Sequence, residues 1–523
     1  MRRFWTSRRA GPIPGDPEAM GTAGEAAPAR DLPSRGLAPD GTLRTGRLAG
    51  LSMNAAIWVL TWPILVESFL NSTVGLTDTV LAARLGESET DAVGGASYVM
   101  WLIGLVFMSV GTGATAMISR SIGKGRLAVA NTVLGQTVLL SVVLGALVGV
   151  IVALLTPVLA AMLGLDPAGA HAFKNYLFVI CAGAPVSMLL FCGIACARGA
   201  GDSKRPLIAM ILRNVVNMIA SFVLSGVDVG YLKNPFSFDL GVMGIAIGTI
   251  LGDTAGTLLI LSMAMKGTWG IRLRAKRLRP HAHTLRRMIR LGIPSFLETL
   301  GMWFGNFLIV LFVGWLALGA GGLLGAHIVA IRIEAFSFLP GFAIGTACAT
   351  LVGQYLGAGA PHLARVAIRR CTVLAGAIMG VLGVAFIVFP RDIVFMLSEQ
   401  PTHLAYTPDL IVIAGWVQIP FGINIVLRSA LRGAGDVKAA MWLIWICTYA
   451  VRLPMAYLLS GVSVPLPAWF PFWGGQSIPH PLHFGPDHNG LYWLWIALCA
   501  EVVIRTIAFA WRYATGAWAR QRV

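Results

Sequence analysis

The feature that most constrains this chain is a series of apolar runs, each long enough to cross a lipid bilayer. A spanning helix needs about 20 apolar residues. Twelve such runs are found, at 51–83, 92–117, 131–155, 173–197, 206–227, 239–265, 292–318, 323–352, 367–390, 404–427, 438–460 and 490–512. Only 12% of the residues are charged, whereas an ordinary soluble domain has about 25%. We therefore expect an all-α integral membrane protein with twelve transmembrane helices.

The basic residues mark one side of the membrane. Of the 40 Lys and Arg residues, 32 fall in the N-terminal tail, in alternate loops with the run ends beside them, and at or after the end of the last run, whereas four fall in or beside the other loops. Cytoplasmic loops carry an excess of Lys and Arg, so both termini are predicted to be cytoplasmic in a multi-pass protein of the inner or plasma membrane. The net charge of +17 then reflects topology and contact with membrane lipid, and no nucleic-acid partner is expected.

Three short segments recur in the same order in both halves of the chain. They are 63–67 and 294–298, 119–125 and 353–359, and 198–204 and 432–438. The spacing is 231 residues for the first pair and 234 for the other two, and six of seven residues are identical in the last pair. Each half has six spans, an even number, so both halves run the same way through the membrane. The repeat predicts two six-helix lobes related by a pseudo-two-fold axis along the membrane normal.

The repeat and the charge pattern divide the chain into five parts. We expect a disordered basic cytoplasmic tail (1–46), an N-terminal six-helix lobe (47–265), a basic cytoplasmic inter-lobe loop (266–290), a C-terminal six-helix lobe (291–516) and a cytoplasmic tail (517–523). Two lobes that face one another form a central cleft, and rocking them opens the cleft to either side in turn.

The last repeated pair is interpreted as two structural loops on the cytoplasmic side. Their main residues are Arg198, Gly199, Gly201 and Asp202 in the first loop and Arg432, Gly433, Gly435 and Asp436 in the second. Glycine permits a tight turn, and each aspartate can cap the next helix or pair with arginine. Neither loop matches the phosphate-binding motif G-x-x-x-x-G-K-[ST].

The first span carries three polar residues on one face. At 100° per residue, Glu67, Asn71 and Asp78 fall on a narrow stripe, with Asp78 about 16 Å further toward the outside than Glu67. An ionisable residue near the bilayer centre costs about 2.5–3.5 kcal/mol, so the stripe is expected to face the protein interior. A carboxylate in an apolar setting takes up a proton more readily. Proton and substrate can then compete for one pocket; the alternative is a structural carboxylate that is hydrogen-bonded between helices.

Further polar side chains in the spans are candidates for the same cleft. They are Asn214, Asn217 and Ser221 in 206–227, Glu298 in 292–318, and His327 and Glu334 in 323–352. Glu67 and Glu298 each follow a proline by four residues, and either face the substrate or are hydrogen-bonded near a kink. His327 and Glu334 share a helix face, where His327 is either a proton relay or an interior histidine with its own hydrogen bonds.

Several of these patterns together resemble the multidrug and toxic compound extrusion (MATE) family, nearest its DNA-damage-inducible branch. They are Pro63…Gly75-Leu-Thr-Asp78…Gly86, the twin Arg-Gly-x-Gly-Asp-x-Lys loops, Gly353-Gln-Tyr-Leu-Gly357 and Arg452-Leu-Pro454. The resemblance implies a twelve-helix, two-lobe secondary antiporter that exports organic compounds against inward H⁺ or Na⁺, with Asp78 as its cation-coupling residue. It also implies amphipathic or cationic substrates.

The resemblance bears on the coupling ion as well. Relatives with a cation site in the first lobe often carry Asp four residues after the Asn of span 5, where this chain has Ser221 after Asn217. Hard cations favour several oxygen ligands that include carboxylates, so H⁺ is favoured over Na⁺. No cofactor other than the coupling ion and no metal site is expected. A small organic substrate and lipid are the expected partners of a monomer, although His480, His483, Asp487 and His488 in the outer loop leave metal binding there open.

Two other functions remain open at this point. A flippase for a lipid-linked precursor would need cationic groups in the cleft, and the spans offer Arg213, Arg332, Arg452 and Arg505, of which Arg505 lies four residues from Glu501 at ion-pair spacing. A membrane-embedded enzyme would need a catalytic motif, and neither H-E-x-x-H nor G-x-S-x-G occurs in the sequence. Both are ranked below a transporter.

Overall fold

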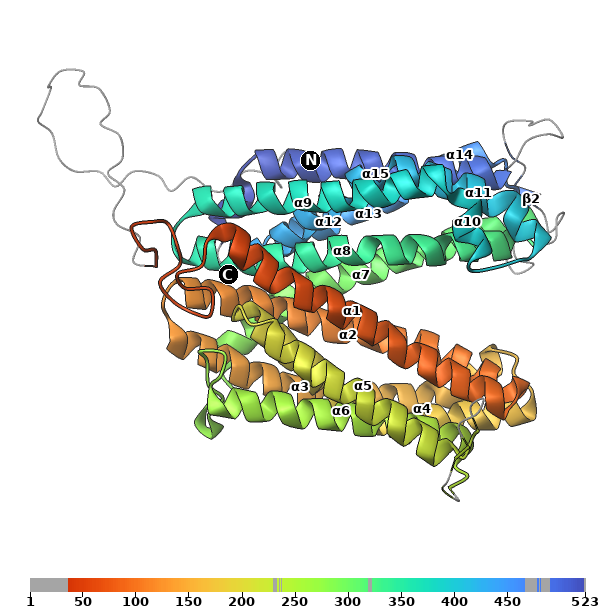
Figure 1. The fold of residues 1–523 in the computed structure, drawn as a ribbon, viewed down its shortest axis with the longest axis horizontal. Coiled ribbons are helices and arrows are strands. Elements are labelled where there is room, and N and C mark those ends of the chain that lie inside the picture. The colour runs from red at the N-terminus through yellow and green to blue at the C-terminus, as the bar shows by residue number, and fades with distance from the viewer. Residues whose placement is uncertain are drawn as a thin grey trace, which may run out of the picture. The chain divides into compact units, whose positions relative to one another are not determined.

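The structure, a computed structural model, is described for residues 36–228, 233–234, 236, 238–317, 322–465, 477–478, 480 and 490–521. Helices make up nearly all of it (Figure 1). The first half of the chain forms α1 (Met53–Leu85), α2 (Glu87–Gly123), α3 (Leu127–Met162), α4 (Pro167–Gly199), α5 (Lys204–Ser225) and α6 (Gly241–Lys266). A short 3₁₀ helix, η2 (Ala275–Arg277), follows.

The second half repeats this order with two interrupted spans. It contains α7 (Ala282–Leu316), α8 (Leu323–Gly357), α9 (Pro361–Val388), α10 (Pro390–Phe395), α11 (Pro401–Trp416), α12 (Gln418–Ala434), α13 (Val437–Trp445), the π-helix η4 (Ile446–Arg452), α14 (Leu453–Ser460), α15 (Gly490–Ala514) and the 3₁₀ helix η5 (Ala517–Arg520). The two-residue strands β1 (Val464–Pro465) and β2 (Ser477–Ile478) pair antiparallel.

The number of spans agrees with the sequence prediction. Within the described residues, eleven helices are long and apolar enough to cross a membrane, and a bent pair, α11 with α12, makes a twelfth. The two members of this pair meet at 57°. Pro420 lies in the first turn of α12, and because proline has no amide hydrogen it cannot continue the hydrogen bonds of α11. The twelve-helix, two-lobe architecture predicted from the sequence is therefore confirmed.

Two predicted boundaries differ from the structure. The inter-lobe loop predicted over 266–290 ends earlier, because α7 begins at Ala282; its first turns carry the arginines that hydropathy assigned to the loop. The tail predicted to be disordered over 1–46 is described only from residue 36. There Leu43 is buried, and the Thr45 hydroxyl donates to the Ile122 carbonyl oxygen at 2.7 Å.

Helix α1 connects the two halves of the structure. Its beginning, at Ala56, Ile57 and Leu60, packs in one apolar cluster with α8, α9 and α12, whereas Leu81 near its end packs with α2–α6. Figure 1 shows α1 running obliquely from α8 toward the other helices of the first half. A change in the far half of α1 is thus connected by one continuous helix to the second lobe.

The lobes make their tightest contact where α2 and α8 end. A Cβ atom added to Gly357 would lie 3.0 Å from the Gly123 Cα atom, and one added to Gly123 would overlap the Gln354 carbonyl oxygen. These glycines belong to the second repeated pair of segments. Nearer the middle of the helices, Trp101 of α2 meets Trp303 of α7 with ring centroids 3.8 Å apart.

We predict that Gly123→Ala destabilises the protein by about 1–3 kcal/mol, because the new methyl group must displace backbone atoms of the other lobe. Gly104→Ala is the matched control. Gly104 lies in the same helix with no atom within 4 Å of the added Cβ, so alanine there is expected to be neutral or to stabilise by about 0.5–1 kcal/mol. Thermal unfolding of the purified variants in detergent measures both changes. Equal melting temperatures would contradict the close contact.

Candidate functional site

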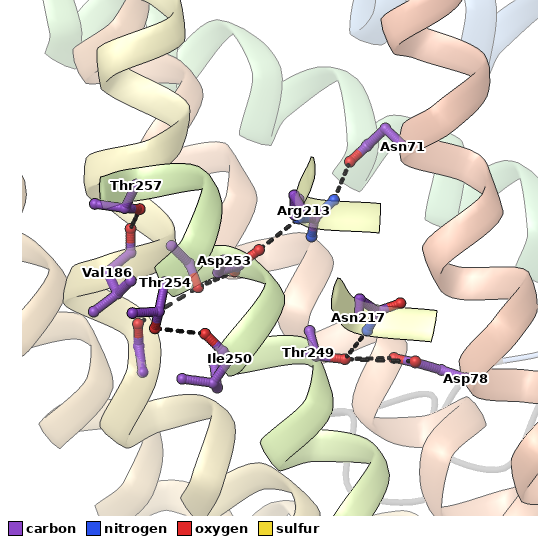
Figure 2. A network of polar contacts seen from close by, with 12 residues as sticks. Asn71, Asp78, Val186, Arg213, Asn217, Thr249, Ile250, Asp253, Thr254 and Thr257 are labelled. Carbon is purple, nitrogen blue, oxygen red and sulfur yellow. Dashed lines mark hydrogen bonds and ion pairs between the residues drawn. The ribbon is translucent and has the colours of Figure 1, made fainter. Parts of the chain in front are cut away.

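Asp78 lies buried among the helices of the first lobe, with only 4% of its surface exposed. The Tyr176 hydroxyl of α4 donates to its Oδ2 atom at 3.0 Å, and the Thr249 hydroxyl of α6 donates to the same atom at 3.2 Å. Asn217 of α5 donates to the Thr249 hydroxyl at 3.0 Å (Figure 2). Among the described residues, no basic group forms an ion pair with Asp78. Its carboxylate is therefore held by neutral donors alone.

A second polar level lies about one helical turn from Asn217 and Thr249 along α5 and α6. Arg213 Nε is 2.5 Å from Asp253 Oδ1, and the Arg213 guanidinium also donates to Asn71 Oδ1 at 3.2 Å (Figure 2). Ser187 donates to the other Asp253 oxygen. Sequence analysis left the partner of Arg213 open; the structure shows that it is an acid on α6.

The polar residues predicted in span 5 divide between two environments. Asn217 and Ser221 belong to the Asp78 network, and the Ser221 hydroxyl donates to the Ile245 carbonyl oxygen at 3.2 Å. Asn214 is also buried, but its amide finds no hydrogen-bond partner among the described residues. Ser221 therefore ties α5 to the backbone of α6.

Glu67 shares a stripe with Asp78 by sequence but not its surroundings. Glu67 Oε1 is 2.7 Å from an Arg198 guanidinium nitrogen, at the end of α4. Asn71, between the two acids, is exposed. The two acids are buried, as the stripe predicted for them, but Asn71 is not. The separation of eleven positions gives Glu67 and Asp78 different partners at different depths.

Glu298 repeats the Glu67 contact in the second lobe. Its carboxylate is fully buried and lies 2.9 Å from Arg432, the counterpart of Arg198, and 2.5 Å from Arg428. In both lobes, the acid that follows the repeated proline thus pairs with the first arginine of the repeated loop. The pairing favours the structural alternative for Glu67 and Glu298 over direct substrate contact.

The remaining second-lobe candidates do not form one network with Glu298. Glu501 pairs with Arg452 at 2.9 Å and with Arg505 at 3.3 Å, as its spacing from Arg505 predicted. His327 accepts a hydrogen bond from the Trp495 indole at 3.0 Å, which favours an interior histidine over a proton relay. The Glu334 carboxylate, half-buried on the same helix, has no hydrogen bond or ion pair with the residues described.

The twin loops hold the lobes together through backbone acceptors. The Gln354 amide of α8 donates to the Gly199 carbonyl oxygen at 3.2 Å, and Arg120 of α2 donates to the Ala434 carbonyl oxygen at 3.1 Å. Each lobe thus donates into the loop of the other.

The loop aspartates pair with arginine, as one of the sequence alternatives predicted. Asp202 lies 2.5 Å from Arg205, and Asp436 lies 2.8 Å from Arg512. Burial raises the pKa of Asp436, although the Arg512 guanidinium opposes this effect. The glycines Gly201 and Gly435 have φ angles of +87° and +85°, which favour glycine at the turn.

Sequence analysis did not identify Tyr176 or Thr249 as partners of Asp78. Tyr176 resembles any buried aromatic residue in its span. Thr249 and Asp253 are four residues apart in a largely apolar, glycine-rich helix, and this spacing puts both on one face. This pair of polar residues on one helix face is the sequence feature from which a polar site on α6 could have been predicted.

Most of the outer-loop residues for which metal binding was left open lie outside the described part of the chain. His483, Asp487 and His488 lie outside it, and His480 contacts the Tyr457 carbonyl oxygen at 2.9 Å. The described residues contain no group of three or more His, Cys, Asp or Glu side chains placed to hold a metal ion.

Comparison with known proteins agrees with the repeat. The MatE family model matches residues 63–223 and again residues 294–458. The probable multidrug resistance protein NorM of Thermotoga maritima is 24% identical over 469 residues, which cover 89% of this chain and 93% of the relative. The multidrug resistance protein MdtK of Pectobacterium atrosepticum is 22% identical over 427 residues, covering 80% and 90%.

Solved structures have the same fold. A MOP superfamily transporter from Pyrococcus furiosus superposes with a TM-score of 0.77 at 19% identity, covering 90% of this chain and 97% of the other. The Vibrio cholerae MATE transporter VcmN in its bent form gives the same score and identity, covering 89% and 97%. The two family matches together span more than half of the chain. The chain therefore belongs to the MatE family, the multidrug and toxic compound extrusion transporters.

Proposed function

We propose that this protein is a secondary active antiporter that exports amphipathic organic compounds, cations included, by alternating access coupled to inward H⁺. Family membership supports a transporter and sets aside the membrane-embedded enzyme. The relatives named as multidrug resistance proteins support organic substrates. The assignment to the DNA-damage-inducible branch stays a prediction.

The observation that carries the proposal is the environment of Asp78. A charged side chain at this depth costs about 2.5–3.5 kcal/mol, and the hydroxyls of Tyr176 and Thr249 compensate it only with neutral hydrogen bonds. One proton removes this charge and weakens the hydrogen bonds that Asp78 accepts from α4 and α6. Asp78 is therefore the group best suited to exchange H⁺.

The groups that surround Asp78 favour a single proton site. Tyr176 on α4 and the Arg213–Asp253 pair on α5 and α6 are the charged or titratable groups that face it from these helices in the described structure. Helix α2 carries no charged residue from 92 to 119. Because Arg213 and Asp253 neutralise each other, the charge of this region changes by one when Asp78 gains or loses a proton.

The course of α1 supports a link between protonation and lobe movement. Asp78 lies in the half of α1 that packs in the first lobe, while the beginning of α1 packs with α8 of the second lobe. A proton on Asp78 that changes its bonds to α4 and α6 therefore acts on a helix shared by both lobes. One proton moving down 100 mV supplies about 2.3 kcal/mol, which corresponds to roughly 50-fold accumulation.

The flippase alternative receives less support from the same structure. A pyrophosphate group needs free cationic side chains. Arg213, Arg452 and Arg505 each form an ion pair with an acid. Of the four arginines within the spans, this leaves Arg332, which is exposed, without an acidic partner among the described residues.

We predict that Asp78→Asn abolishes efflux driven by a pH gradient, because the amide cannot exchange a proton. The measurement is efflux of a cationic dye from proteoliposomes with an imposed pH gradient or an imposed Na⁺ gradient. Asp409→Asn is the control, since Asp409 is exposed on α11. Wild-type rates for Asp78→Asn would reject the assignment of Asp78, and efflux driven by Na⁺ alone would reject H⁺ coupling.

Tyr176→Phe is expected to shift the pH profile of efflux upward. The Tyr176 hydroxyl donates to Asp78 Oδ2, and a donor to a carboxylate stabilises its ionised form. Without this donor, Asp78 takes up its proton at a higher pH. Initial efflux rates measured between pH 5 and pH 9 test the direction, with Tyr98→Phe at an exposed tyrosine as the control. A shift toward lower pH, or none, would argue against proton exchange at Asp78.

A further inference from the structure

We infer that Arg213 is a built-in cation that neutralises the second carboxylate of the first lobe and thereby makes this transporter select H⁺ over Na⁺. The inference rests on the proposed function, because it concerns the ion that Asp78 exchanges. It assigns a role to a residue whose ion-pair and hydrogen-bond partners in the described structure are Asp253 and Asn71 and not Asp78.

The two polar levels of the first lobe are built on the same four helices, α1, α4, α5 and α6. Arg213 and Asn217 are four residues apart on α5, and Thr249 and Asp253 are four residues apart on α6, a spacing that puts each pair on one helix face. The Asp78 level and the Arg213–Asp253 level are thus separated by about one turn, or 5.4 Å. Figure 2 shows the two levels one above the other.

The oxygen atoms at these levels would suit a hard cation if both carboxylates were free. Asp78 accepts a hydrogen bond from the Thr249 hydroxyl, which in turn accepts one from the Asn217 amide. The Asn217 Oδ1 atom accepts no hydrogen bond from the described residues. Asn217 is only 1% exposed, so this oxygen is buried without a donor. Hard cations take several oxygen ligands, carboxylates among them. The site therefore lacks only a second available carboxylate.

Arg213 keeps that second carboxylate occupied. Its Nε atom is 2.5 Å from Asp253 Oδ1, and its side chain is only 13% exposed. A hydrogen bond to Asn71 on α1 holds the other end of the guanidinium. One arginine and two aspartates leave a single negative charge, which one proton neutralises. Removing the arginine would leave two carboxylates about one turn apart. Their like charges repel each other, and together with the neighbouring hydroxyl and amide oxygens they would offer a hard cation the ligand set that it prefers.

The test uses two single variants and their combination. Arg213→Gln frees Asp253. Asp253→Asn instead leaves the Arg213 guanidinium without its acid, so that Asp78 becomes the carboxylate available to it. The double variant, Arg213→Gln with Asp253→Asn, removes both charges and restores the net charge of the wild type. It is the matched control for each single change.

Na⁺ binding is measured first, without transport. The purified proteins are unfolded thermally in detergent while NaCl replaces choline chloride at constant ionic strength. We expect a saturable rise in the melting temperature for Arg213→Gln, because a ligand of the folded state stabilises it. The wild type and the double variant should show no such rise. A folded Arg213→Gln variant that does not respond to Na⁺ would overturn the inference.

Transport is the second measurement. It tests the inference with Asp253→Asn and the double variant even if Arg213→Gln does not fold. In proteoliposomes, we expect Asp253→Asn to lower the rate of efflux driven by a pH gradient by about tenfold or more. The freed Arg213 guanidinium would attract the ionised Asp78 and oppose its protonation, and an attraction of about 1.4 kcal/mol is enough for a factor of ten. The double variant should recover this activity. Wild-type activity of Asp253→Asn, or a double variant as impaired as Asp253→Asn, would contradict the role of Arg213.

The failure of the proposed function and the failure of this inference give different results. If the wild type is driven by Na⁺, H⁺ coupling is wrong, and the wild type should then also be stabilised by Na⁺ with Arg213 in place, which overturns the inference as well. If the wild type is driven by H⁺ through Asp78 and Arg213→Gln ignores Na⁺, only the role of Arg213 is rejected.

Discussion

The need to compensate charged side chains inside a lipid bilayer governs this structure. Each acidic group buried in the spans must find donors or a counter-ion within the protein. Glu67, Glu298, Asp253 and Glu501 do so with arginine. Asp78 instead accepts hydrogen bonds from neutral hydroxyls. This difference separates the acids that hold the fold together from the one whose charge a proton can remove.

The two lobes share a duplicated framework but differ in charge. In each lobe, the acid after the repeated proline binds the arginine that opens the cytoplasmic loop. The second lobe adds a further arginine at this position, Arg428. The first lobe instead has the Asp78 network, for which the structure shows no counterpart among the described residues of the second lobe. Pseudo-symmetry thus preserves the scaffold, while the polar contacts inside the two lobes differ.

The interface between the lobes combines tight backbone packing with a shared helix. Glycines at the ends of α2 and α8 bring the backbones together, and side chains of each lobe donate to the loop carbonyl groups of the other. Helix α1 begins against the second lobe and ends within the first. Protonation at Asp78 would therefore act on an element that contacts both lobes, which is the connection that an antiporter needs between its ion and its conformation.

The sequence by itself determined the class of the protein, the number of spans and the internal repeat, because hydropathy and spacing are properties of the chain alone. It also predicted that Asp78 faces the interior and that Glu501 pairs with Arg505, because the cost of a charge in lipid and the helical period are known from the sequence. Only the tertiary structure decided that Glu67 is bonded to Arg198 and that Asp78 meets Tyr176 and Thr249. Those partners come from other helices at a particular depth, and the periodicity of one helix specifies neither its neighbours nor their relative height.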